Sequence, residues 1–127
     1  MIPLKTIQNA ADLLELGMYA EAFELAENLP EDIRDVAAAR RVRLRAATAL
    51  GRWQLAIKLA VSLKLGNEAD RREAAAAFHT LASEACKRGR DAEARQLIGA
   101  AIAARPAQLE TILTDERFPE KFRQRLG

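Results

Sequence analysis

Alanine and leucine recur along the chain at spacings of three and four residues, which places them on one face of a helix. Charged side chains occupy many of the positions between them. Alanine and leucine are also strong helix formers, whereas Gly and Pro mark breaks between helices. The pattern predicts helices over residues 4–16, 19–29, 33–50, 53–65, 69–88 and 91–104. We therefore expect an all-α fold without a strand.

Three segments of the chain align with one another on a glycine. The aligned segments are LELGMYAEAFELAENLP, TALGRWQLAIKLAVSLK and CKRGRDAEARQLIGAAI, and their glycines are 34 and 38 residues apart. The glycines are Gly17, Gly51 and Gly89, and the residues five positions later are Ala22, Ala56 and Ala94. Glycine adopts the positive φ that ends a helix and reverses the chain, and alanine lets two helices approach closely. The repeat predicts three helical hairpins.

A turn glycine, an aromatic residue two positions later and an alanine five positions later resemble the tetratricopeptide repeat (TPR). Tyr19 and Trp53 match the aromatic just past the turn, and Pro106 matches the proline that closes a repeat. The resemblance implies three degenerate repeats over about 4–30, 33–65 and 69–105, with a C-terminal capping segment over 106–127. It also implies one domain, residues 1–127, in which antiparallel helix hairpins stack as a right-handed superhelix.

The tail, PAQLETILTDERFPEKFRQRL, carries two further apolar stripes. Leu109, Ile112 and Leu113 form the first, while Phe118 and Phe122 form the second at i, i+4 spacing. The last repeat of a solenoid leaves one apolar face uncovered, so we expect the tail to cap it. The alternative is that the tail forms a contact between copies of the chain, as in a homodimer.

The composition is typical of one soluble domain with its own core, at 127 residues, 50% hydrophobic and 30% charged. We expect no secretory signal, because Asp12 and Glu15 interrupt the apolar residues of the N-terminus. No run approaches the roughly 18 apolar residues of a membrane span. The single Cys86 has no partner for an internal disulfide. We therefore expect a cytoplasmic protein without membrane association.

Residues typical of catalysis or of metal and cofactor binding are scarce. His79 is the only histidine, and no glycine-rich phosphate loop is present. Acidic residues are scattered along the helices with lysine or arginine three or four positions away, which is usual for a solvated helix surface. We therefore expect no catalytic site, no metal and no cofactor, and a protein that is not an enzyme.

The TPR resemblance implies a binding surface. In TPR proteins the concave groove is lined by the first helix of each repeat, and counting back from each turn glycine gives the groove-facing positions. These are Ile7, Ala11, Leu14, Arg41, Arg45, Thr48, His79, Ser83 and Lys87. An apolar first repeat followed by a basic stripe would suit an acidic peptide or protein segment with a hydrophobic anchor. The alternative interpretation is that these residues form solvated helix surfaces.

Nucleic acid is the second class of ligand that we consider, since the chain has a net charge of +2 and a pI near 9.0. The arginines that would contact phosphates are Arg40, Arg41, Arg43, Arg45, Arg71 and Arg72. The 18 acidic residues would repel phosphate, and exposed aromatics for base stacking are lacking. We therefore favour a protein-interaction adaptor over a nucleic-acid binder.

Overall fold

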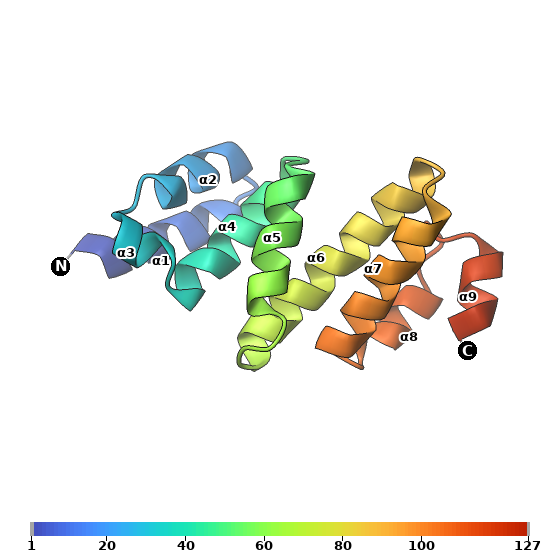
Figure 1. Ribbon diagram of the computed structural model, residues 1–127. Coiled ribbons are helices and arrows are strands. Elements are labelled where there is room, and N and C mark those ends of the chain that lie inside the picture. Colours follow the sequence, from blue (N-terminus) through green and yellow to red (C-terminus); the bar gives the residue numbers. More distant parts are fainter. Residues whose placement is uncertain (1, 127) are drawn as a thin grey trace.

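The computed structural model describes residues 2–126, and it contains helices joined by turns and short loops. Met1 and Gly127, which the expected domain and capping segment include, lie outside the described residues. The helices are α1 (Ile2–Glu15), α2 (Tyr19–Glu27), α3 (Glu31–Arg34), α4 (Ala37–Ala49), α5 (Trp53–Leu63), α6 (Glu68–Lys87), α7 (Asp91–Ala104), α8 (Gln108–Leu113) and α9 (Glu120–Leu126). No strand occurs within residues 2–126, so the all-α prediction is confirmed (Figure 1).

The expected continuous helix over residues 33–50 is wrong. The chain breaks at Val36, which has an extended backbone with φ −69° and ψ 153°, and this break separates α3 from α4. Arg40 Nε donates to the backbone oxygen of Asp35 at 2.7 Å, which satisfies a carbonyl at the end of α3. The short helix α3 begins directly after Pro30 and has two acidic residues in its first turn.

The three hairpin turns share one backbone geometry. Gly17, Gly51 and Gly89 have φ of 76°, 74° and 75°. At the first turn, the Gly17 N–H donates to the Leu14 oxygen at 3.0 Å, and the Met18 N–H donates to the Leu13 oxygen at 2.9 Å. The same pair of bonds recurs at the other two turns. This is the Schellman motif, whose left-handed residue is strained by any side chain, and it explains the repeated glycine.

The helices pack in the order in which they follow one another along the chain. α1 packs with α2, α4 with α5, and α6 with α7 across the glycine turns. α4 also contacts α1 and α2, and α6 contacts α4 and α5, so consecutive hairpins lie against one another. Figure 1 shows this succession from α1 and α2 at one end to α8 and α9 at the other. The aligned residues Ala22, Ala56 and Ala94 are fully buried in it.

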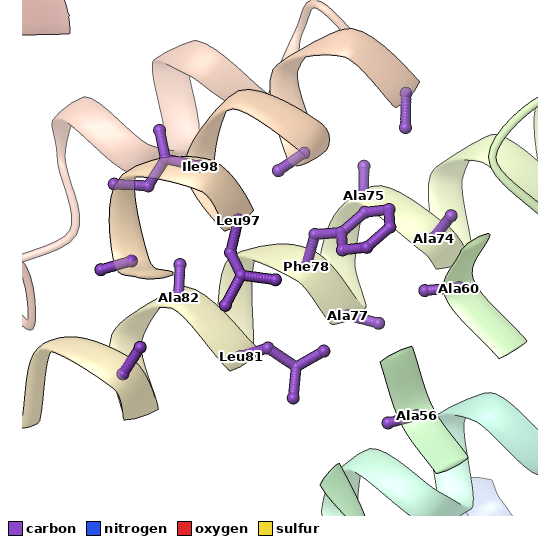
Figure 2. Close-up of a cluster of buried hydrophobic side chains, with 14 of the residues drawn as sticks. Ala56, Ala60, Ala74, Ala75, Ala77, Phe78, Leu81, Ala82, Leu97 and Ile98 are labelled. Atoms are coloured by element: carbon purple, nitrogen blue, oxygen red, sulfur yellow. The ribbon is translucent and has the colours of Figure 1, made fainter. Parts of the chain in front are cut away.

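The buried apolar side chains form two clusters. The smaller one joins α1, α2 and α4, and the larger one extends from α4 and α5 to the tail. Figure 2 shows Phe78 and Leu81 of α6 surrounded by small side chains, with Ala60 and Ala77 nearby. Phe23 packs against both clusters and links them. Because so much of the core is alanine, the helix backbones approach one another closely.

The tail lies against the last hairpin. α8 contacts α6, α7 and α9. Ile112, Phe118 and Phe122 are only 0%, 1% and 3% exposed, and they belong to the larger cluster. The guanidinium of Arg95 in α7 lies over the Phe122 ring, 4.8 Å from its centroid. The tail therefore covers apolar surface that α6 and α7 would otherwise expose.

The substitution Ala56→Leu tests how closely α5 approaches its neighbours. Ala56 is fully buried in the larger cluster, so a leucine there must push its surroundings apart. We expect the free energy of unfolding to fall by about 1–3 kcal/mol. Urea denaturation followed by circular dichroism measures this change, with Val61→Leu at an exposed position of the same helix as the control. Equal stability of Ala56→Leu and wild type would contradict the close packing.

Candidate functional site

The first helices of the three hairpins, α1, α4 and α6, are in contact along one surface, which we call the α1–α4–α6 face. A depression of about 520 Å³ between α4 and α6 is lined by Tyr19, Arg45, Thr48, Ala49, Arg72, Glu73, Ala76, Ala77 and Thr80. A second, of about 230 Å³ between α1 and α4, is lined by Ile7, Gln8, Ala11, Leu14, Ala38, Arg41, Val42, Arg45 and Glu73. The two depressions adjoin, since Arg45 and Glu73 line both.

Most of the expected groove residues are brought together on this face. The smaller depression is lined by Ile7, Ala11, Leu14, Arg41 and Arg45, and the larger one by Arg45 and Thr48. Ile7 and Leu14 are 8% and 4% exposed, so they form the floor of the smaller depression, while Arg45 lies open to solvent. The residues of α1 and α4 that are obtained by counting back from the turn glycines therefore line the two depressions.

On α6 the same counting fails, because two of the three expected residues are buried and none of them lines either depression. His79 and Ser83 are 5% and 7% exposed, so neither side chain lies on an open surface. His79 contacts the tail, with its ring 5.5 Å from that of Phe118, and the Ser83 hydroxyl donates to the Thr80 carbonyl at 2.9 Å. Lys87 is exposed and lies outside both depressions. Its Nζ is 3.5 Å from Oε1 of Glu84.

The error arises from the direction of side chains around α6. Each step along an α-helix turns the side chain by about 100°. His79 precedes Thr80 by one residue, and this rotation points it away from the open face and toward the tail. The groove prediction therefore missed Glu73 and Thr80, and the sequence placed Arg72 only in the expected phosphate-binding stripe. A signal was present, because Arg72, Ala76 and Thr80 are spaced four apart and share one face of the helix.

His79 is the centre of a polar network that holds the tail. Gln108 Nε2 lies 2.8 Å from Nδ1 of the ring and donates to it, so Nε2 carries the proton and donates to Asp115 Oδ2 at 2.7 Å. Arg117 also donates to both oxygens of Asp115, from Nε to Oδ1 and from Nη2 to Oδ2. This bond to Arg117, and secondarily the one to His79, hold the pKa of Asp115 well below its usual value. Both ring nitrogens are engaged by residues of the tail, so His79 fastens the tail to α6.

Arg41 is engaged by an acidic residue of the next hairpin. Its Nη1 lies 2.5 Å from Oδ1 of Asp70, whose side chain is only 8% exposed. Asp70 also forms a capping box with Asn67 at the start of α6, where its carboxylate accepts from the Asn67 N–H at 3.1 Å. Gly66 leaves room for this carboxylate, because a Cβ there would lie 2.2 Å from Asp70 Oδ2. Arg41 therefore secures the start of α6.

The other arginines of the expected phosphate-binding stripe are engaged as well. Arg43 is 8% exposed and pairs with Glu27 and Asp35. Arg45 Nη1 lies 3.0 Å from Glu15 Oε1, and both side chains are exposed. The remaining interactions are those of Arg40 with the Asp35 carbonyl, Arg71 with the Asn67 carbonyl and Arg72 with Glu68. These arginines do not form an open row of unpaired guanidinium groups.

Glu73 is the exception among the charged residues of the face. It lines both depressions, and its carboxylate has no hydrogen bond or ion pair within the described part of the chain. Burial raises the pKa of Glu73, whereas the positive charges of Arg45, Arg41 and Arg72 oppose that rise. The α1–α4–α6 face thus presents a half-buried carboxylate without a partner.

No family model matches the chain, and no curated protein or solved structure matches it either. Among residues 2–126, no three histidine, cysteine, aspartate or glutamate side chains are grouped so as to hold a metal ion. No helix in this range combines the length and the apolar character needed to cross a membrane. The geometry of the α1–α4–α6 face is therefore the basis on which a function is assigned.

Proposed function

We propose that the protein is a non-enzymatic interaction module, located in the cytoplasm, that binds an extended segment of a partner protein on the α1–α4–α6 face. We also propose that its hairpins form a TPR-like stack with a right-handed superhelical course. The three Schellman turns and the fully buried alanine that follows each of them support this assignment. In such a stack the first helices of successive hairpins together form the binding surface.

The pair of adjoining depressions carries the proposal. The floor of the larger one includes Ala49, Ala76 and Ala77, and that of the smaller one includes Ile7 and Leu14. Charged side chains border both floors, and hydroxyl groups border the larger one. Apolar floors with a few polar groups at the edges are typical of surfaces that bind peptide segments. An extended segment places alternate side chains on one side, which suits two neighbouring depressions.

Exposed apolar side chains extend this surface at the first turn. Tyr19 is 37% exposed and lines the larger depression. Met18 and Leu16, in the turn that precedes Tyr19, are 39% and 74% exposed. Large apolar side chains gathered beside a depression are characteristic of interaction sites, because their burial by a partner is favourable. Tyr19 supplies such an apolar side chain at the larger depression.

Nucleic-acid binding is the weaker hypothesis because the arginines it requires are engaged within the chain. Arg43 is buried and paired, and Arg41 is held by Asp70. Contact with phosphate would require these residues to leave their carboxylates, which would expose a buried acidic group to a polyanion.

The substitution Ala76→Arg tests the proposed docking surface. Ala76 is exposed in the larger depression, so an arginine there fills the depression without disturbing the core. We expect the immobilised variant to lose partners that the wild-type protein captures from a lysate of its source cell. For a purified partner, we expect affinity to fall at least about tenfold by isothermal titration calorimetry.

The matched control is Ala103→Arg, which adds the same side chain at an exposed position of α7 outside both depressions. Both variants should melt at nearly the wild-type temperature. Capture that depends on Ala103 and is indifferent to Ala76 would place binding elsewhere on the molecule and overturn the proposal.

A further inference from the structure

We propose that the larger depression binds a basic side chain, an arginine or a lysine of the partner segment, with Glu73 as its carboxylate partner. This inference rests on the proposed function and specifies the chemistry of the bound segment. It differs from the acidic ligand that the sequence alone favours, because the structure shows which charges on the face are already paired.

The balance of charge on the face favours a cation. Arg41, Arg45 and Arg72 lie against Asp70, Glu15 and Glu68 respectively, so each of these pairs is close to neutral when seen from a few ångströms away. Glu73 has no such partner in the described chain. Its carboxylate is therefore the charge left uncompensated at the point where the two depressions adjoin.

The shape of the depression suits a long side chain with a charged end. Ala49, Ala76 and Ala77 provide an apolar floor for the methylene groups of an arginine or lysine. Tyr19 lines the same depression with a partly exposed ring, and the face of such a ring attracts a cation. The depression of about 520 Å³ thus combines an apolar floor, an aromatic ring and a carboxylate.

The environment of the Glu73 carboxylate also favours a basic side chain as the ligand. Burial raises the pKa of its carboxyl group although the positive charges of Arg45, Arg41 and Arg72 oppose that rise, which means that these arginines compensate the lost hydration only in part. A guanidinium or ammonium group that docks on Glu73 would restore favourable interactions to this charge.

An acidic segment would have to compete with carboxylates of the chain itself. To bind Arg41, it would displace Asp70, which is buried and also caps α6. To bind Arg45, it would displace only the exposed Glu15, but it would then lie beside the uncompensated Glu73. Like charges in this position repel each other, so the acidic ligand is the less favourable occupant.

Three synthetic peptides test the proposal directly. Each is an acetylated and amidated pentapeptide with leucine on either side of a central arginine, citrulline or glutamate. Citrulline has nearly the shape of arginine but lacks its charge, so the comparison isolates the cation. The peptides are titrated into ¹⁵N-labelled protein, and the amide shifts of residues 72–80 and of Tyr19 are followed by NMR. We expect the arginine peptide to bind about tenfold more tightly than the citrulline peptide.

The variant Glu73→Gln should abolish this preference. The matched control is Glu84→Gln on the same helix, outside both depressions, and it should preserve the preference. Glu73→Gln should also be at least as stable as wild type, since it removes a charge whose burial is unfavourable. A thermal melt therefore verifies that the variant is folded.

The result that would overturn the inference is equal binding of the arginine and citrulline peptides, tighter binding of the glutamate peptide, or no shift at the face with any peptide. An arginine preference that survives Glu73→Gln would overturn it as well. Equal binding of arginine and citrulline at residues 72–80 would leave the docking surface in place and remove only its basic specificity. Retention of every captured partner by Ala76→Arg would instead remove the docking surface itself.

Discussion

Replacement of Phe118 by alanine is expected to lower the free energy of unfolding by about 3–5 kcal/mol. Phe118 is 1% exposed, and it packs in the larger cluster beside the imidazole of His79. Its loss leaves a cavity where the tail meets α6, and it removes the apolar support for the bonds that His79 makes to Gln108 and Asp115. The tail should then detach before the hairpins unfold.

Urea denaturation measures the loss of stability, and hydrogen exchange shows where it occurs. We expect amides of α8 to exchange faster in Phe118→Ala, while amides of α1 and α2 keep their protection. Leu65→Ala, at an apolar residue that is 88% exposed, is the control and should change stability by less than about 0.5 kcal/mol. A loss below about 1 kcal/mol for Phe118→Ala would mean that the tail contributes little to the stability of the hairpins.

The positions of the hairpins follow from the sequence because they depend on local chemistry. A residue with positive φ must end each first helix, and glycine is the residue that adopts it without strain. The break at Val36 was missed because it depends on Arg40 and Arg43, which bind Asp35 from the next helix. Such interactions are not visible in the spacing of apolar residues.

The exposed face of α6 could be predicted only in part. Periodicity shows which residues share a face, but it does not show which element covers that face. The tail covers His79, whereas Ala76 and Thr80 on the adjacent side of the helix line the open depression. The partners of a charged residue are likewise set by tertiary packing. For this reason the sequence predicts Arg41 as a ligand-binding residue, although it forms an ion pair with Asp70 in the structure.

The repeat register explains why two of the expected ligand-binding residues are structural. Arg41 and His79 both lie ten residues before a turn glycine, Gly51 and Gly89. Each binds a carboxylate of the element that follows its own hairpin, namely Asp70 at the start of α6 and Asp115 after α8. A basic residue at this position of the repeat therefore joins one hairpin to the next element. The same position in the first repeat is Ile7, which is buried in the smaller cluster.

This role predicts that Arg41→Ala destabilises the protein. Removal of the guanidinium leaves the Asp70 carboxylate buried without its cation. Breaking a buried ion pair from one side commonly costs about 3–5 kcal/mol. Arg41 is 27% exposed at its side chain, so water compensates part of the loss. We expect the free energy of unfolding to fall by about 2–4 kcal/mol in urea denaturation.

Arg45→Ala is the matched control, because it removes the same side chain one turn further along α4 from an exposed pair with Glu15. We expect it to cost less than about 1 kcal/mol. Adding Asp70→Asn to Arg41→Ala should recover part of the lost stability, since asparagine is neutral and still accepts a hydrogen bond from Asn67 at the start of α6. If Arg41→Ala and Arg45→Ala lose equal stability, or if Asp70→Asn lowers it further, then the contact between Arg41 and Asp70 does not join the second hairpin to the third.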